Sequence, residues 1–250
     1  MSKEHSQRWK TAAVLLGIIA LVALINSKFL TWVFFGVVYA FGVFEASKLF
    51  RVKLSKEITL ALSLVWIGGY FYPNPIELSF IGAIFLASIL AYDKRISKEA
   101  VALAFYPTAG ILAIWSLYLS FGMESLLWLL VIVALSDVGA YYSGKKFGKR
   151  GFSPTSPKKT VEGVIGGVAL ATIGGAFLIS NSYLPLGSVI IAFFTSISSV
   201  FGDLFESYLK REAGVKDSGD ILPGHGGVLD RVDGYLFASV TLYIFLKIAG

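Results

Sequence analysis

The sequence of 250 residues has no cysteine, only two histidines and few charged residues. The absence of cysteine excludes disulfides, thiolate zinc sites and cysteine nucleophiles. Charged residues make up 15% of the chain, whereas a soluble globular protein carries about 25%. With 56% hydrophobic residues and a mean hydropathy of +0.73, the chain lacks the polar surface that water requires. It is predicted to be an integral membrane protein.

The charge that is present is mainly basic, with a formal net charge of +6 and a pI near 9.3. In a soluble protein this balance would suggest nucleic acid as a partner. The sequence shows no aromatic-basic pattern of the usual nucleic-acid-binding modules, and basic residues are typical of the cytoplasmic loops of membrane proteins. We therefore expect a lipid bilayer, and no nucleic acid, as the partner.

Long apolar stretches divide the chain into candidate spans. A helix that crosses a bilayer needs about 20 mainly apolar residues. The sequence predicts an all-α, polytopic transmembrane helix bundle of about nine spans, in a single integral membrane domain over residues 1–250. The predicted spans are 10–26, 29–45, 57–72, 76–92, 99–120, 124–143, 161–181, 185–208 and 229–248.

The distribution of basic residues predicts the orientation of these spans. Of the 22 Lys and Arg residues, 19 fall at the N-terminus and in the loops after every second span. Lys28 and Lys247 fall on the opposite side, and Arg231 lies at the start of the last span. Because basic residues accumulate in cytoplasmic loops, we expect a cytoplasmic N-terminus and an external C-terminus, in the inner (cytoplasmic) membrane of the cell.

Carboxylates occur in three of the predicted spans, although an ionised side chain at the centre of a span costs about 2.5–3.5 kcal/mol or more. Asp137 follows an apolar run in the sixth span. Asp230 and Asp233 are three residues apart in the ninth span and therefore share one face. The eighth span has Glu206 beside a polar stripe at spacings of three and four, formed by Ser196, Ser199, Asp203, Ser207 and Lys210.

These carboxylates allow two interpretations. Each one alone is consistent with an interfacial helix end that water reaches. Together, Asp203, Asp230 and Asp233 flank one glycine-rich loop on the same predicted side, where their charges would repel each other unless a cation lay among them. Carboxylate oxygens are the ligands of hard divalent cations, so Mg²⁺ is predicted. A second cation is a further option, as in two-metal phosphoryl-transfer sites.

Two predicted cytoplasmic loops, 144–163 and 209–228, combine glycine, proline, hydroxyl and basic residues, a composition suited to anions. Gly224, Gly226 and Gly227 allow backbone N–H groups to approach phosphate oxygens closely. His225, in the run PGHGG, is a candidate for phosphate contact or for protonation of a leaving group. The basic residues predicted to neutralise a triphosphate or to contact substrate are Lys210, Arg211, Lys216, Lys158 and Lys159. Lys145 and Lys146 are assigned to topology or to attraction of anionic lipid.

Residues 207–233, SYLKREAGVKDSGDILPGHGGVLDRVD, resemble the signature of the CDP-diacylglycerol synthase (phosphatidate cytidylyltransferase) family. The family pattern is S-x-(apolar)-K-R-x4-K-D-x-(small)-x2-(apolar)-(P/G)-x-H-G-G-(apolar)-x-D-R-(apolar)-D. The sequence meets its fixed positions with Ser207, Lys210, Arg211, Lys216, Asp217, His225, Gly226, Gly227, Asp230, Arg231 and Asp233. SDVGAYYSGKKFGK and SPKKTVEG resemble two further conserved blocks, and FGDLFES resembles the lead-in to the signature. The specific resemblance covers residues 130–235, which we expect to carry the catalytic motifs.

The resemblance implies a nucleotidyltransferase of phospholipid biosynthesis that uses Mg²⁺ to convert CTP and phosphatidic acid into CDP-diacylglycerol and pyrophosphate. The lipid phosphate would attack the α-phosphorus of CTP in line at the cytoplasmic face of the membrane. The resemblance also implies metal ligation by Asp203 and Asp230. Together with the residue patterns, it predicts substrate binding by Asp137, Lys158, Lys159, Ser207, Gly226 and Gly227. The predicted catalytic residues are Lys210, Arg211, Lys216, Asp217, His225, Asp230, Arg231 and Asp233.

Two alternative functions share this composition. Another phospholipid phosphotransferase, such as a CDP-alcohol phosphotransferase, would carry the motif D-G-x2-A-R-x8-G-x3-D-x3-D, which the sequence lacks. A polytopic transporter would place carboxylates near the bilayer midplane and across repeats, whereas here they gather near one predicted face. The small residues of span 161–181 permit close helix packing, either in a homodimer or within one subunit.

Overall fold

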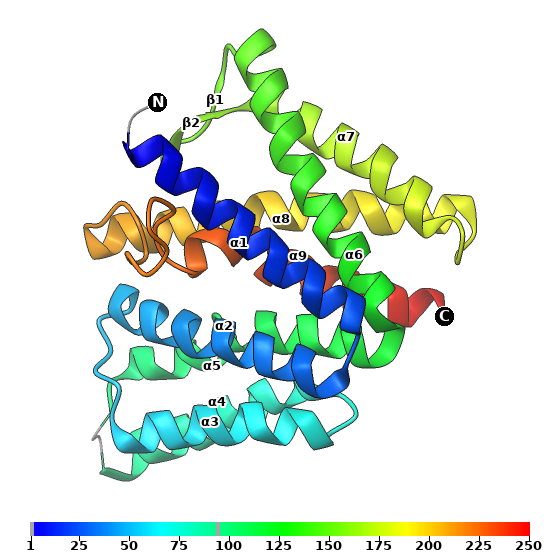
Figure 1. Cartoon of the computed structure of the whole chain (residues 1–250). Coiled ribbons are helices and arrows are strands. Elements are labelled where there is room, and N and C mark those ends of the chain that lie inside the picture. Colours follow the sequence, from blue (N-terminus) through cyan, green and yellow to red (C-terminus); the bar gives the residue numbers. More distant parts are fainter. Residues whose placement is uncertain (1–2, 94–95) are drawn as a thin grey trace. The chain divides into compact units, whose positions relative to one another are not determined.

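The computed structural model describes residues 3–93 and 96–250, which form helices joined by short loops and one β-hairpin (Figure 1). Lys94 and Arg95, two of the basic residues in the orientation argument, lie outside the described residues. The short elements are the 3₁₀ turns η1 (Pro75–Glu77) and η2 (Lys98–Val101), α5 (Ala102–Phe105) and the strands β1 (Gly151–Ser153) and β2 (Ser156–Thr160). The long helices are α1 (Lys3–Ile25), α2 (Lys28–Leu49), α3 (Lys56–Phe71), α4 (Leu78–Asp93), α6 (Thr108–Phe147), α7 (Val161–Ile179), α8 (Pro185–Ala213) and α9 (Leu229–Ala249).

The chain divides into two compact units, which are described separately. The first unit consists of Met1–Trp115 and Glu212–Val232, and the second consists of Ser116–Arg211 and Asp233–Gly250. The divisions fall within α6, α8 and α9. The single membrane domain expected over residues 1–250 stays a prediction.

In the first unit, serine side chains start two of the helices. The hydroxyl of Ser27 accepts from the N–H of Leu30 at 3.5 Å, and that of Ser55 accepts from Ile58 at 3.4 Å. Such caps satisfy N–H groups that have no partner within the helix. In the core, the buried Trp115 donates its indole N–H to the Gly69 carbonyl at 2.7 Å. Tyr39 of α2 donates its hydroxyl to the Leu62 carbonyl of α3 at 3.0 Å, and this bond holds α2, whose C-terminal half carries part of the candidate site.

In the second unit, small residues bring α6 and α7 into close contact. A Cβ atom on Gly139 of α6 would lie 2.9 Å from the carbonyl oxygen of Gly166 on α7, which is closer than real Cβ contacts allow. The close packing predicted for the small residues of span 161–181 is therefore confirmed. The helical path of α6 is interrupted at Gly122, which has φ 71° and lies between the predicted spans 99–120 and 124–143.

The predicted loop 144–163 contains a β-hairpin rather than irregular chain alone (Figure 1). Strands β1 and β2 pair antiparallel, with Ser153 opposite Ser156. Thr160 ends β2 and caps α7, because its hydroxyl accepts from the N–H of Gly163 at 3.1 Å. The hairpin gives Lys158 and Lys159 a fixed position at the start of α7.

Within residues 3–93 and 96–250, six helical segments are long and apolar enough to cross a membrane. They are Lys28–Leu49, Pro75–Tyr92, Lys98–Phe147, Val161–Ile179, Pro185–Ala213 and Leu229–Ala249. Large apolar side chains such as Phe177, Leu186 and Ile248 are exposed on these helices, as expected for surfaces that face lipid. An all-α, multi-pass membrane architecture is thus confirmed, while the count of nine spans and the orientation of the termini stay predictions.

Candidate active site

The residues of the signature form two clusters, one in each unit. The first surrounds Glu45 of α2, whose side chain is fully buried (0% exposed). Its Oε1 atom accepts from the backbone N–H of Val228 at 2.9 Å, and Oε2 accepts from Leu229 at 2.8 Å and from the hydroxyl of Ser218 at 3.0 Å. These backbone groups are at the N-terminus of α9, where N–H groups lack helical partners and the helix dipole is positive. Glu45 therefore fastens the start of α9 to α2.

Asp230 makes a second set of bonds to the same loop. Its Oδ2 atom accepts from the N–H of Ser218 at 2.9 Å, from the Ser218 hydroxyl at 3.0 Å and from the N–H of Gly227 at 2.8 Å. A Cβ on Gly226 would lie 2.6 Å from this oxygen, and one on Gly227 would lie 2.5 Å from Oε2 of Glu45. The glycines of the HGG run thus allow two carboxylates to approach the loop backbone. We call Glu45, Ser218, Gly227 and Asp230 the loop cluster.

The rest of the signature loop is held by its own backbone and by Arg231. The guanidinium of Arg231 donates to the carbonyl of His225 from Nε at 3.0 Å and from Nη2 at 2.7 Å. Nδ1 of His225 lies 3.5 Å from the carbonyl oxygen of Pro223. Lys216 and Asp217 are exposed. In this arrangement Arg231 stabilises the loop, while the side chains of Lys216 and Asp217 are open to ligands.

The second cluster consists of carboxylates and lysines in the second unit. Nζ of Lys159 on β2 lies 2.5 Å from Oδ2 of Asp203 on α8, and Oδ1 of Asp203 accepts from the hydroxyl of Ser207 at 3.4 Å. One turn further along α8, Nζ of Lys210 lies 2.6 Å from Oε2 of Glu206, whose side chain is 0% exposed. Asp203, Ser207 and Lys210 of the polar stripe predicted on the eighth span therefore take part in these side-chain contacts.

Asp137 and Asp233 extend this cluster from α6 and α9. Asp137 interacts electrostatically with Asp203 and Lys159, and Asp233 interacts with Asp203 and shares a hydrogen bond with Glu206. The backbones of α8 and α9 approach closely here, since a Cβ on Gly202 would lie 2.6 Å from the carbonyl oxygen of Asp233. We call Asp137, Lys159, Asp203, Glu206, Lys210 and Asp233 the lysine–carboxylate cluster. Of the other predicted residues of this unit, Lys158 and Arg211 are exposed.

The residues that the structure describes contain no group of three or more His, Asp or Glu side chains arranged to hold a metal ion. This observation is compatible with Mg²⁺, which is usually held by one or two carboxylates together with waters and substrate phosphates. In the lysine–carboxylate cluster, four carboxylates face two lysines, so added positive charge would be stabilised. Asp203 and Asp137 are the oxygen donors that fit. Asp203 and Asp230 belong to different units, and a cation shared by them stays a prediction.

The sequence interpretation missed Glu45. The signal was available, because an ionisable residue in an otherwise apolar span indicates a functional or structural role. Glu45 lies at the end of the predicted span 29–45, outside residues 130–235, which carry the specific resemblance to the family. Only the fold brings it to residues 218–229.

Comparison with known proteins identifies the family. The sequence profile of the cytidylyltransferase family matches residues 6–249. The chain belongs to the cytidylyltransferase family. A phosphatidate cytidylyltransferase of Helicobacter pylori strain J99 is 44% identical over 248 residues, which cover 98% of this chain and 92% of the relative. The chain is therefore a nucleotidyltransferase, and the transporter alternative is set aside.

More distant relatives carry the same name. A phosphatidate cytidylyltransferase of Thermotoga maritima is 39% identical over 208 residues, 76% of each chain. That of Bacillus subtilis strain 168 is 31% identical over 239 residues, covering 84% of this chain and 87% of the relative. The predicted family resemblance is thus confirmed, and it extends over nearly the whole chain rather than the C-terminal half alone.

Proposed function

We propose that this enzyme transfers the cytidylyl group of CTP to phosphatidic acid, giving CDP-diacylglycerol and pyrophosphate. The observation that carries the proposal is the likeness, over 98% of the chain, to a relative named for this activity. The signature residues support it, because they supply carboxylates, lysines and a glycine-rich loop on helices of a membrane protein. CTP is soluble and the acyl chains of phosphatidic acid stay in lipid, so an enzyme joining them must be open to both.

The chemistry requires positioning and charge neutralisation more than a protein nucleophile. A phosphate oxygen of the lipid forms a bond to the α-phosphorus of CTP, and the bond from that phosphorus to the bridging oxygen of the β-phosphate breaks. The electron pair leaves with pyrophosphate. Lys159 is assigned to the lipid phosphate, while the exposed Lys158, Arg211 and Lys216 are assigned to the triphosphate. Ser207 lies beside Asp203 and orients it, and Asp137 lies beside Lys159 and orients it.

Mg²⁺, held by Asp203 with Asp137 or with Asp230, would neutralise phosphate charge during the transfer. The ammonium group of Lys159 pairs with the carboxylate of Asp203 at 2.5 Å. When phosphate groups enter, the ammonium group of Lys159 can exchange its carboxylate partner for a lipid phosphate oxygen. This exchange would leave the carboxylate of Asp203 available as an oxygen ligand for the cation. His225 remains a candidate for contact with the leaving pyrophosphate.

The activity is tested with purified protein in detergent and CTP labelled on the γ-phosphate. We expect release of labelled pyrophosphate that depends on added phosphatidic acid and on Mg²⁺, with formation of CDP-diacylglycerol in equal amount. Diacylglycerol serves as the control acceptor, since it lacks the attacking phosphate. Pyrophosphate release that does not respond to phosphatidic acid would contradict the proposed reaction.

We further propose nine spans in the inner membrane, with the N-terminus and the active site at the cytoplasmic face. The 19 basic residues on one side support this orientation. Because the chain has no native cysteine, each introduced cysteine is the sole label site. Lys53→Cys and Lys149→Cys should react with an impermeant maleimide only from the cytoplasm, and Asn74→Cys and Asn181→Cys only from outside. Labelling of positions 149 and 181 from the same side would overturn the orientation.

A further inference from the structure

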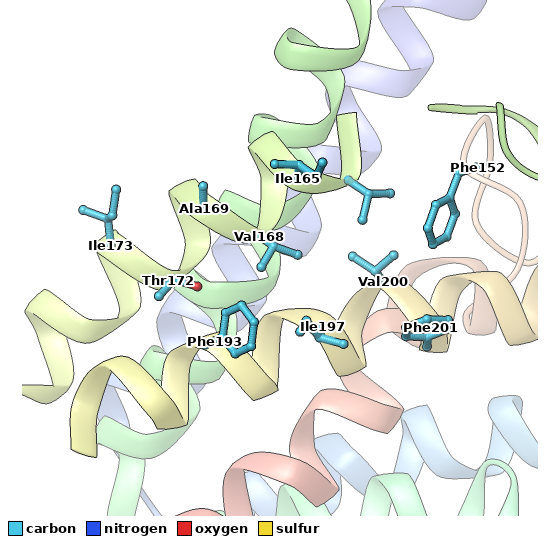
Figure 2. A pocket seen from close by; sticks show the side chains of 11 residues that line it. Phe152, Ile165, Val168, Ala169, Thr172, Ile173, Phe193, Ile197, Val200 and Phe201 are labelled. Carbon is cyan, nitrogen blue, oxygen red and sulfur yellow. The ribbon is translucent and has the colours of Figure 1, made fainter. Parts of the chain in front are cut away.

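The second unit contains an apolar groove between α7 and α8 (Figure 2). Its volume is about 570 Å³, within the range of about 300–1,000 Å³ that ligand pockets have. Aliphatic and aromatic side chains form nearly all of its lining, and Thr172 is the one residue of the lining with a polar side chain. We call it the α7–α8 groove; it is lined by Phe152, Val164, Ile165, Val168, Ala169, Thr172, Ile173, Phe193, Ile197, Val200 and Phe201.

The α7–α8 groove and the lysine–carboxylate cluster share two elements, the hairpin and α8. Phe152 on β1 lines one end of the groove, and its ring centroid is 6.2 Å from that of Phe201 on α8 (Figure 2). The partner strand β2 carries Lys159, and Asp203 follows Phe201 by two residues on α8. The hairpin and α8 thus contribute both the apolar end of the groove and the Lys159–Asp203 ion pair. An apolar groove on the same two elements as an ammonium group matches a molecule with an acyl chain next to an anionic head.

We propose that the α7–α8 groove binds one acyl chain of phosphatidic acid and so presents the lipid phosphate to Lys159. This inference rests on the proposed function and extends it to the site that recognises the lipid. A nucleotide does not fit a lining in which Thr172 is the one polar side chain, because most of its polar atoms would lose their water without compensation. A bulk membrane lipid also contacts apolar helix faces. Only a lipid whose phosphate pairs with Lys159 gains both the apolar contacts of the groove and the ionic contact with the ammonium group.

The groove acts by shape and position. Lipid tails are already in an apolar solvent, so the chain gains packing contacts rather than removal from water. A chain held between α7 and α8 restricts where its phosphate lies, which raises the fraction of encounters in a reactive arrangement. The contribution of the groove to the binding of phosphatidic acid should therefore depend on the length of the acyl chain. It should disappear for acyl chains too short to enter the groove.

The test is a substitution that fills the groove. Val168→Trp places an indole between α7 and α8, and Val189→Trp makes the same change at an exposed position of α8 outside the groove. For dioleoyl phosphatidic acid in mixed micelles, Val168→Trp should raise KM at least about tenfold, as expected when ground-state binding is removed. Its KM for CTP, and its kinetics with dihexanoyl phosphatidic acid, should stay within about twofold of the unmodified enzyme. Val189→Trp should behave as the unmodified enzyme with both lipids.

The possible results distinguish a failure of the groove assignment from a failure of the proposed function. If the unmodified enzyme releases no pyrophosphate with either lipid, the proposed function fails. If it is active but Val168→Trp keeps the KM for the dioleoyl lipid, or affects both lipids equally, the groove assignment is overturned. Should Val168→Trp fail to fold, phosphatidic acid with a diazirine on one acyl chain decides the question in the unmodified protein. Crosslinks within 164–173 and 193–201 are expected, and crosslinks confined to other helices would overturn the proposal.

Discussion

The loop cluster and the lysine–carboxylate cluster hold their carboxylates by different partners. Glu45 and Asp230 accept from backbone N–H groups and from one serine hydroxyl, at 2.8–3.0 Å. Asp203 and Glu206 are paired with the ammonium groups of Lys159 and Lys210 instead. Both arrangements neutralise buried or half-buried negative charge, but only the second uses partners that are themselves mobile.

Because of this difference, we assign the two clusters different roles: the loop cluster holds the conformation of the loop, and the lysine–carboxylate cluster takes part in the reaction. A backbone N–H group cannot leave its carboxylate unless the loop itself moves, so the loop cluster fixes a conformation. A lysine ammonium group ends a flexible chain and rotates to new acceptors, so it can exchange a carboxylate for a phosphate. We therefore expect changes in the loop cluster to alter stability and activity together. Changes to the partly exposed Lys159–Asp203 pair of the lysine–carboxylate cluster should alter activity with little loss of stability.

The largest effects are expected from Asp203→Asn and Asp230→Asn. Each should lower turnover by at least about 10²-fold, as the loss of one strong electrostatic group in a transition state does. Raised Mg²⁺ should recover part of the activity in Asp203→Asn, because a weakened ligand lowers cation affinity. Thermal unfolding should distinguish the two, since only Asp230 accepts three hydrogen bonds from the loop. Equal melting temperatures for the two variants would contradict the comparison.

Glu45→Ala should have the next largest effect, with a loss of both stability and turnover. It leaves the N–H groups of Val228 and Leu229 without their acceptor and the hydroxyl of Ser218 with Asp230 alone, and an unsatisfied buried donor costs about 1–3 kcal/mol. We expect a lower melting temperature and at least about tenfold lower kcat, with Glu45→Gln intermediate because it keeps one acceptor oxygen. The exposed Glu124 supplies the control: Glu124→Ala should change neither quantity. Normal kcat in folded Glu45→Ala would show that the loop needs no anchor on α2.

Lys159→Gln is expected to act mainly on the lipid substrate. It removes the ammonium group that neutralises Asp203 and that we assign to the lipid phosphate. The KM for phosphatidic acid should rise about tenfold, with a smaller change in the KM for CTP, since a charged hydrogen bond contributes about 1.5–3 kcal/mol. The melting temperature should change little because the pair is partly exposed. An increase confined to the KM for CTP would reassign Lys159 to the nucleotide.

Asp217→Asn should have the smallest effect. Its side chain is exposed in the signature loop, and surface substitutions usually change stability by less than about 0.5 kcal/mol. We expect turnover within about threefold of the unmodified enzyme, measured under the same Mg²⁺ series as Asp230→Asn. A loss as large as that of Asp230→Asn would place Asp217 among the substrate-binding groups.

Much of the architecture follows from local sequence. Apolar stretches predicted the helices because each one satisfies its own backbone hydrogen bonds and needs no partner to form in lipid. The spacing of Asp203, Ser207 and Lys210 predicted a polar stripe because helical periodicity alone sets which residues share a face. The hairpin 151–160 was not predicted, since its short strands lack alternating apolar residues and their pairing depends on the flanking helices.

The partners of the charged residues could be decided only by the tertiary structure. The sequence by itself determined that the chain belongs to an enzyme family that acts at a membrane. It also determined the helices that carry Asp137, Asp203, Asp230 and Asp233. It did not indicate that Glu45, some 180 residues away from Val228 and Leu229, would accept the N–H groups at the start of α9. Nor did it indicate that Lys159 rather than Lys210 would neutralise Asp203. Hydrogen bonds and ion pairs are short-range and directional, so they are fixed by which helices pack together, a property that no local pattern of residues contains.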